Sequence, residues 1–278
     1  MDLQYFGTAT VGLTIGSRRL LTDPAFDAAE TEYDFGPWYA PRAWFTSRKT
    51  YATVSAPAEV DAFLLSHDQH ADNLDDAGRS LVAASRAPVF TTCAGARRLA
   101  RPAPPDRASH AGDGLGLAAR VHGLDAGAAT QLGDLTITAM PARHGPRGTP
   151  QVHEVIGFLL EAPQQPTVWI SGDTVLYPAL RAALTALHDA GKRVDVAIVH
   201  CGGVAFPRVP MLGRELFTFD AAQAIEAVRL LDPGLVVPIH RDGWTHFRQS
   251  EADLRVAFDD AGLAARSRFL ARGETLHL

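Results

Sequence analysis

The stretch of sequence that decides the fold is LLSHDQHADNLD, residues 64–75. It overlaps an apolar run at residues 62–65 that predicts a short buried strand. His and Asp side chains in such a place cost desolvation free energy unless they pair or bind metal. Imidazole together with carboxylate suits zinc, iron or manganese. A polar loop that caps the following helix is the alternative, because Asp72 or Asn73 would serve as an N-cap.

The composition is that of an ordinary globular protein. Of the 278 residues, 46% are hydrophobic and 21% are charged, which is enough to bury a substantial core. The formal net charge of −5 argues against a nucleic-acid partner, because binding to phosphates needs a basic surface. The chain has two cysteines, Cys93 and Cys201, which are too few for a disulfide framework and suit a reducing cytosol.

The chain also lacks the sequence patterns of secretion and membrane insertion. The N-terminus has no basic segment followed by an apolar one, so we expect no secretory signal. No apolar run approaches the roughly 20 residues that a membrane-spanning helix needs. We therefore expect a cytoplasmic protein without a membrane span, and the sequence is compatible with a homo-oligomer.

The order of predicted elements indicates two similar halves, each a β-ribbon followed by alternating strands and helices. Strands are predicted at residues 8–15, 19–22, 62–65, 88–92, 119–124, 135–139, 155–160, 167–170, 194–199, 235–239 and 268–270, and helices at 74–85, 94–100, 178–190, 221–231 and 250–260. This pattern predicts two sheets packed face to face, with the helices outside.

Two stretches carry no regular pattern. Residues 101–116 are rich in Pro, Gly, Ala and Asp and read as a surface loop. Residues 27–58 form a longer irregular stretch, of a length that is often functional. We expect its aromatic residues to pack this loop onto the body of the protein; they include Tyr33, Trp38, Tyr39 and Trp44.

Polar groups follow four later strands in the same way as they follow residues 62–65. The strand at 135–139 leads to His144, the one at 167–170 to Asp173, the one at 194–199 to His200, and the one at 235–239 to His240. Binding groups in α/β sheets gather beyond the carboxyl ends of strands. His144 alone could be a core histidine and Asp173 alone a helix cap. Five such strand ends in one chain indicate a common site.

With these strand ends, the chain resembles the metallo-β-lactamase superfamily. An early His/Asp loop, a lone His, a Gly-Asp-Thr and a late His follow one another in the order of that family. The chain looks most like the branch of ascorbate-6-phosphate lactonase-like and N-acyl-phosphatidylethanolamine phospholipase-like hydrolases. The resemblance extends from GTAT at 7–10 and LTDP at 21–24 to PIH at 238–240. It implies a single domain over residues 1–278, an α/β protein with the four-layer αββα sandwich, and one or two metal ions between the sheets.

The resemblance also implies roles for individual residues. His144 resembles the third histidine of the first metal site, and Asp173 the carboxylate that bridges both metals. Asp72 and His240 resemble the aspartate and the last histidine of the second site. Cys201 does not fall on a ligand position and is expected to be a buried thiol.

The His-x-His-x-Asp-His motif of the family is altered in this chain. Without a gap, the first and last histidines of the motif become Asp68 and Asn73. With Gln69 as an insertion, His67 takes the place of the first histidine. His70 stays a ligand candidate in either register, so only one of His67 and Asp68 needs to face the metal.

The change at Asn73 bears on the second metal site. An amide oxygen is a weaker ligand for a transition metal than imidazole, so Asn73 is expected to weaken that site. Asp72 remains a ligand candidate in both registers. His246 is a candidate pocket residue that could compensate, and His200 is expected at the wall of the pocket, whereas His153 is expected to be an ordinary surface residue.

These residues favour a metal-dependent hydrolase that uses a metal-activated water on an ester, lactone or phosphodiester bond of a small substrate. A bound metal lowers the pKa of water toward about 7, and we expect one or two zinc or manganese ions, with iron also compatible. Asp173 would orient the nucleophile, and Asp72 would take a proton if the second metal is missing. Arg143 and Arg241 would hold a substrate phosphate or carboxylate, unless they simply face solvent.

Three alternatives stay open at this point. The same ligand types allow a diiron oxidoreductase on this fold, although no flavodoxin-like segment follows. A phosphodiesterase or nuclease is disfavoured by the net charge of −5. A non-catalytic or weakly active metal-binding member of the fold is supported mainly by Asn73, since fold membership does not fix function.

Overall fold

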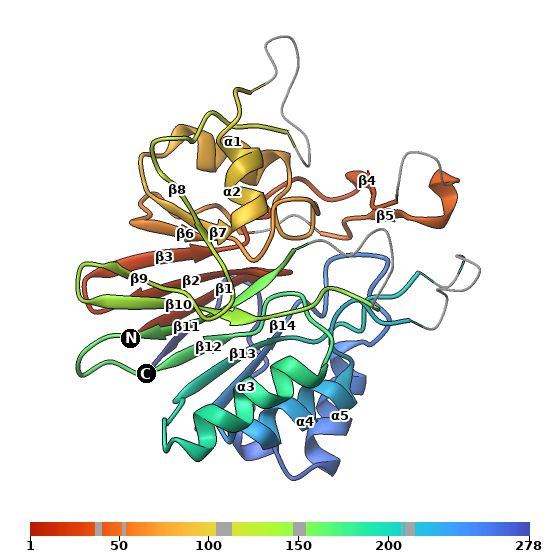
Figure 1. Cartoon of the computed structure of the whole chain (residues 1–278). Helices are drawn as coiled ribbons and strands as arrows, with labels where there is room; N and C mark the ends of the chain where they lie inside the picture. The colour runs from red at the N-terminus through yellow and green to blue at the C-terminus, as the bar shows by residue number, and fades with distance from the viewer. Residues whose placement is uncertain (37–40, 52–53, 104–112, 147–153, 207, 209–214) are drawn as a thin grey trace.

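In the computed structural model, two β-sheets lie face to face in the middle of the molecule, and helices cover the outer side of each (Figure 1). The structure describes every residue except 37–40, 52–53, 104–112, 147–153, 207 and 209–214. The two ends of the chain lie side by side, because the Met1 amino group donates a hydrogen bond to Leu278 O at 2.9 Å. Within the described ranges, every helix is too short or too polar to span a lipid bilayer.

The first sheet combines an antiparallel ribbon with parallel strands. Its strands, in the order β15-β1-β2-β3-β6-β7-β8, are β15 (Thr275–His277), β1 (Asp2–Gly7), β2 (Thr10–Ile15), β3 (Arg18–Thr22), β6 (Ala62–Leu64), β7 (Val89–Thr92) and β8 (Val121–Leu124). From β3 to β8 the neighbours are parallel, so their carboxyl ends share one edge of the sheet. Helices α1 (Asp76–Ala84) and α2 (Cys93–Leu99) lie on its outer face.

The second sheet repeats this plan. Its strands, in the order β14-β13-β12-β11-β10-β9, are β14 (Leu235–Ile239), β13 (Val196–His200), β12 (Val168–Ile170), β11 (Ile156–Glu161), β10 (Leu135–Pro141) and β9 (Ala129–Leu132). The strands β12, β13 and β14 are parallel to one another. Helices α3 (Pro178–Asp189), α4 (Ala221–Leu231) and α5 (Glu251–Asp260) cover the outer face. The predicted four-layer αββα sandwich is thereby confirmed.

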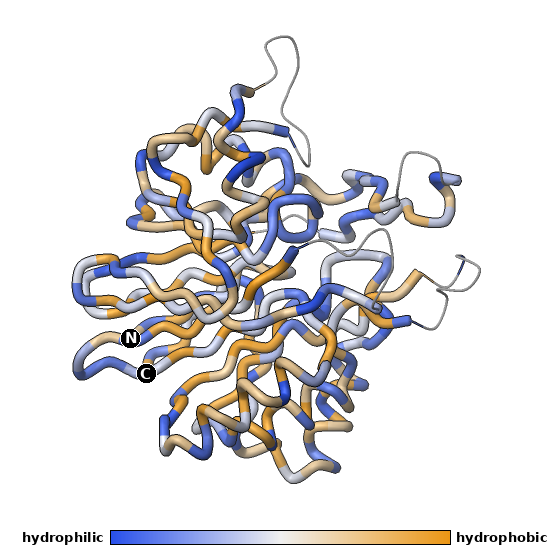
Figure 2. Tube along the Cα trace, in the orientation of Figure 1, coloured by the Kyte–Doolittle hydropathy of each residue, from blue (hydrophilic) through white to orange (hydrophobic). Residues whose placement is uncertain are grey.

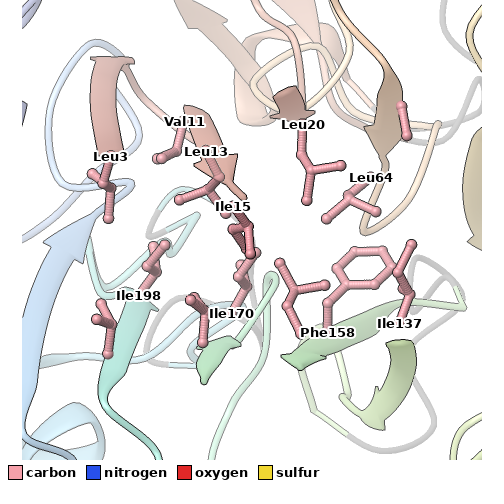
Figure 3. Packing of buried hydrophobic residues seen from close by; sticks show 14 of the residues in the cluster. Leu3, Val11, Leu13, Ile15, Leu20, Leu64, Ile137, Phe158, Ile170 and Ile198 are labelled. Atoms are coloured by element: carbon pink, nitrogen blue, oxygen red, sulfur yellow. The ribbon is translucent and has the colours of Figure 1, made fainter. Parts of the chain in front are cut away.

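An apolar layer fills the space between the sheets. Figure 3 shows Leu13 and Leu20 of the first sheet facing Phe158 and Ile170 of the second, and all four are buried. Burying one such side chain stabilises the fold by roughly 1.5–3 kcal/mol. Hydrophobic residues are concentrated along the strands in the middle, and hydrophilic residues lie mostly in the outer turns and loops (Figure 2). The layer therefore fixes the position of one sheet relative to the other.

The predicted helices agree with the structure to within two residues, and the differences concern strands. The strand β1 was not predicted, and the strand expected over 8–15 begins only at Thr10, because Gly7 and Thr8 turn with φ of 125° and 53°. The strand β9 was also not predicted. The strand predicted at 268–270 is wrong: that segment follows a single bridge between Val236 and Ser267, and the last strand is β15.

The irregular stretch after residue 27 packs onto the body as its aromatic content predicts. It contains the short pair β4 (Glu32–Asp34) and β5 (Thr46–Arg48) and the 3₁₀ turn η1 (Arg42–Trp44). Buried Phe45 joins an apolar cluster with Phe206 and Phe217, against which Trp44 packs. Trp38 and Tyr39 lie outside the described residues.

A buried ion pair connects this stretch to the first helix layer. Lys49 Nζ lies 3.1 Å from Asp75 Oδ2 and donates to Ala25 O at 2.9 Å, and both charged side chains are fully buried. Asp75 is also the N-cap of α1, where its side chain accepts from Gly78 N. Burial lowers the pKa of Lys49 and raises the pKa of Asp75, and the partner charge opposes the shift in each case.

We expect Lys49→Met to destabilise the protein by about 3 kcal/mol, because it leaves the Asp75 carboxylate buried without its cation. Urea unfolding measures the loss of unfolding free energy. Arg48→Met is the matched control: Arg48 pairs with Glu30 at 2.8 Å on the surface, and its loss should cost less than about 1 kcal/mol. Equal effects of the two substitutions would show that the buried pair is not a stabilising contact.

Candidate metal centre

The candidate site lies where strand ends from both sheets meet. The loop after β6 carries residues 67–73 in the first sheet. In the second sheet, the strands β10, β12, β13 and β14 lead to four polar residues: His144, Asp173, His200 and His240. This gathering follows from the parallel strands, whose carboxyl ends point to the same edge of each sheet.

Two tight turns direct the side chains inward. Gly172 has a φ of 62°, and a Cβ on it would lie 2.6 Å from Ile156 O, so this turn before Asp173 requires glycine. His240 has a φ of 53°, which a non-glycine residue adopts at a conformational cost. Its backbone N donates to Thr8 O at 2.7 Å, which holds the turn. Backbone strain of this kind clusters at functional sites.

Three histidines direct ring nitrogens toward one point. His70 Nδ1 lies 3.0 Å from His67 Nε2 and 2.9 Å from His144 Nε2. His144 Nδ1 donates to Phe217 O at 2.7 Å, which leaves a lone pair on its Nε2 in the neutral ring. His67 Nδ1 lies 3.0 Å from Ser66 Oγ, a partner that allows the same tautomer. His67 and His144 are buried, with 0% and 3% of their surface exposed.

This arrangement fits a metal ion. A tetrahedral zinc ion with Zn–N bonds of 2.0–2.1 Å separates its ligand atoms by about 3.3 Å, close to the spacing of these three nitrogens. Hydrogen bonds among the rings leave some of these nitrogens without a hydrogen to accept, whereas one ion would bind the lone pairs of all three nitrogens together. His67, His70 and His144 form one of the two side-chain groups in the described part of the chain that could hold a metal.

The second such group consists of Asp173, His200 and His240. His200 Nδ1 donates to Asp173 Oδ1 at 2.8 Å, and His240 Nε2 lies 3.6 Å from Asp173 Oδ2. His240 Nε2 also lies 3.2 Å from Asp72 Oδ2. All of these side chains are buried. The two groups thus lie next to each other, because one loop carries His70 of the first group and Asp72, which contacts His240 of the second.

The imidazoles keep both carboxylates ionised. Burial alone would raise the pKa of Asp173, but the charge of His240 and the hydrogen bond from His200 hold that pKa well below its usual range. Hydrogen bonds from His240 and His246 likewise outweigh burial and hold the pKa of Asp72 far below its usual range. Burial lowers the pKa of His200 and of His246, which favours neutral rings. The site therefore offers carboxylate and imidazole together.

Asp68 lies outside both groups. Its carboxylate forms a two-pronged ion pair with Arg98, with Nη2 to Oδ1 at 2.6 Å and Nε to Oδ2 at 3.0 Å. His67 instead joins His70 and His144. The observed geometry corresponds to the register in which Gln69 is the inserted residue.

The two arginines considered for substrate binding differ. Arg241 faces neither the site nor the solvent. It is 3% exposed, pairs with Glu251 at 3.1 Å and donates to Leu270 O at 2.7 Å. Arg143 is half-buried, with its guanidinium carbon 4.7 Å from the centre of the Tyr177 ring. It borders a surface pocket of about 330 Å³. Of the two, only Arg143 is placed to contact a ligand.

Loop residues that the strand-end pattern does not indicate complete the site. A small cavity of about 10 Å³ lies against His70, His144 and Asp72, and its other walls are mostly aromatic: Phe35, Phe45, Phe206, Phe217 and His246. A cavity of this size holds about one water molecule. Sequence periodicity carries no information on these residues because they lie in irregular segments.

Three further residues complete this description. Asp23 directly follows β3, and its Oδ1 accepts from Ser66 N at 2.7 Å, so it holds the start of the histidine loop. Its place at a strand end and within LTDP could have indicated this role. Cys201 is buried as predicted, and burial raises the pKa of its thiol to about 12. His153 lies outside the described residues.

The chain is similar to known proteins over its whole length. A hydrolase described as metal-dependent, from Pyrobaculum calidifontis, is 26% identical over 282 residues, covering 100% of both chains. Among solved structures, a possible metal-dependent hydrolase from Veillonella parvula has a TM-score of 0.78 at 18% identity, over 100% of this chain and 99% of that one. The isothiocyanate hydrolase from Delia radicum gut bacteria has a TM-score of 0.74 at 19% identity, with the same coverage. These two structures share the fold.

The sequence profile of the beta-lactamase superfamily domain matches residues 18–241. This range extends from the start of β3 to the residue after His240 and so includes every strand end that forms the site. The match, the αββα layers and the two groups of histidine and carboxylate side chains all indicate the same family. The chain therefore belongs to the metallo-β-lactamase superfamily.

Proposed function

We propose that this protein is a metal-dependent hydrolase in which His67, His70 and His144 hold the first metal ion. The observation that carries this proposal is the convergence of three imidazole nitrogens. His70 Nδ1 lies 3.0 Å from His67 Nε2 and 2.9 Å from His144 Nε2. Imidazole suits zinc and iron, and the neighbouring carboxylates suit manganese. The relatives named metal-dependent hydrolases give independent support.

A divalent ion at these residues would supply Lewis acidity, which lowers the pKa of water toward about 7 and polarises a carbonyl or phosphoryl oxygen. The protein supplies orientation. Phe217 O fixes the tautomer of His144, and Ser66 Oγ allows the same tautomer in His67. The ionised carboxylates of Asp72 and Asp173 can accept hydrogen bonds from the attacking water and orient it. Asp72 would take up the proton of that water only where no second ion is bound.

Aromatic walls give the reaction a dry environment. Phe35, Phe206 and Phe217 line the cavity next to His70 and His144. Side chains of this kind exclude bulk water and so strengthen the electrostatic interactions of the charged groups. The narrow cavity favours a small substrate whose scissile bond alone reaches the site.

The bond we propose is an ester, lactone or phosphodiester, as in the ascorbate-6-phosphate lactonase-like and N-acyl-phosphatidylethanolamine phospholipase-like branch. The support is Arg143, the residue before His144 in the sequence, whose guanidinium borders a surface pocket and suits a phosphate or carboxylate group. We also propose that residues 1–278 act as one domain, because β1 and β15 pair in the same sheet.

Removal of metal is expected to destabilise the protein. Ligand binding at 100 times the dissociation constant stabilises a fold by about 2.7 kcal/mol, so chelation should lower the unfolding temperature and added zinc or manganese should restore it. His144→Ala should lose this response, whereas His188→Ala, on the exposed side of α3, should keep it.

Elemental analysis of protein purified without added metal completes this test. Bound zinc or manganese is the expected result. A protein that carries no transition metal, and whose unfolding temperature does not respond to added metal, would contradict the proposal. Iron with an optical absorption band would indicate oxidoreductase chemistry instead.

Asp173→Asn is expected to lower kcat/KM by at least about 100-fold, because it removes the charge that orients the nucleophile while keeping the shape of the side chain. A panel of lactone, phosphodiester and β-lactam substrates identifies the reaction to be followed. Asp195→Asn is the control, since Asp195 precedes β13 at the opposite end of the sheet and binds Thr167 N. Unchanged activity of Asp173→Asn would rule out this site.

A further inference from the structure

Asn73 stands where the family motif has a histidine, and its side-chain amide lies between the two carboxylates. The amide atom nearest to them is 3.2 Å from Asp72 Oδ1 and 3.1 Å from Asp173 Oδ2, and a nitrogen in that place donates to both. An amide oxygen is a weaker ligand for a transition metal than imidazole. Asn73 therefore does not replace the imidazole that the motif supplies at this position.

Another histidine reaches the same carboxylate from a distant part of the chain. His246 Nε2 lies 3.1 Å from Asp72 Oδ2, and His240 Nε2 lies 3.2 Å from that same oxygen. His240 Nε2 is in turn 3.6 Å from Asp173 Oδ2. Two imidazole nitrogens and two carboxylate oxygens therefore converge, which is a donor set typical of zinc and related ions.

The surroundings of His246 orient it as they would a metal ligand. Its Nδ1 lies 2.5 Å from Ser47 Oγ, and Ser47 Oγ lies 3.2 Å from Thr245 Oγ1. In the metal-free protein Nε2 donates to the Asp72 carboxylate. When Nδ1 instead donates to Ser47 Oγ, the neutral ring would offer the lone pair of Nε2 to an ion beside Asp72. Phe35 and Phe247 contact the ring, each with its centroid 4.8 Å away, and the residue is 3% exposed. This packing holds the ring in one orientation.

His200 is the competing candidate, and its contacts differ. Its Nδ1 donates to Asp173 Oδ1, the oxygen that neither His240 Nε2 nor Asn73 contacts. Its ring stacks on His240 at 5.3 Å, with an angle of 21° between the planes. These contacts describe a residue that positions Asp173 and His240.

We propose that His246 supplies the imidazole missing at Asn73 and completes a second metal position with Asp72, His240 and Asp173. This inference rests on the proposed metal-dependent function and adds a ligand that the family motif does not include. The protein then binds two ions per chain despite the altered motif. The replacement comes from the loop after β14, residues 240–249, and so from the second sheet.

Metal titration of four proteins tests this assignment. Metal-free wild type, His246→Ala, His200→Ala and His144→Ala are titrated with Co²⁺, followed by visible absorption and by elemental analysis after gel filtration. We expect two ions for the wild type. His246→Ala should keep one tight ion and bind the second at least about 100-fold more weakly, since loss of even an outer partner costs 10–100-fold. His200→Ala should still bind two ions, and His144→Ala should lose the first.

The outcomes separate this inference from the proposed function. A wild type that binds one ion at the three-histidine group, or a His246→Ala variant that still binds two ions with wild-type affinity, overturns the inference and leaves the proposed function standing. A wild type that binds none overturns both. Near-ultraviolet circular dichroism of the metal-free variants checks that each one is folded.

A measurement on the unaltered protein covers the case in which His246→Ala does not fold. Crystals of the wild type soaked in zinc locate the ions by anomalous scattering. The expected result is a second peak within bonding distance of His246 Nε2, with Asp72 and His240 as its neighbours. A second peak bound by His200 and not by His246 overturns the inference.

Discussion

Apolar packing between the two sheets is the interaction on which the site depends. Leu13 and Leu20 on one side meet Phe158 and Ile170 on the other, and the closely packed layer leaves the sheets little freedom to slide. The three-histidine group combines side chains from both sheets, since His67 follows β6 and His144 follows β10. Nitrogens from different layers can therefore meet only while this packing is intact.

Charge balance is the second constraint, and it explains why the site contains so many histidines. Asp72 and Asp173 are ionised and buried, which costs several kcal/mol for each unpaired charge. His200, His240 and His246 reduce that cost by hydrogen bonding to the carboxylates. A metal ion would compensate the charges more completely than these rings do. The same residues thus form a hydrogen-bonded polar network that contributes to folding and, under the proposed function, to chemistry.

Sequence reasoning predicted most of the fold and part of the site. Helical periodicity identified α3 and α4, and continuous apolar runs identified the central parallel strands, which are buried on both faces. Strand-end position selected His144, Asp173 and His240, which the structure brings to the candidate site. The choice between His67 and Asp68 could not be made, since it depends on Arg98, which is distant in sequence. The same holds for the partners of His144 and His246, Phe217 and Ser47, which lie in segments without periodicity. For Arg241 the strand-end position was misleading: its buried guanidinium pairs with Glu251 and does not face the site.

The buried pair between Lys49 and Asp75 links two segments that touch the metal centre. Ser47, which contacts His246, lies two residues before Lys49 on the same stretch of chain. Asp75 lies two residues after Asn73 and begins α1. The pair therefore couples the position of the stretch that carries Ser47 to the position of the loop that carries Asn73. Substitutions outside the site that loosen this coupling would widen the distribution of distances between the histidines without altering any of them.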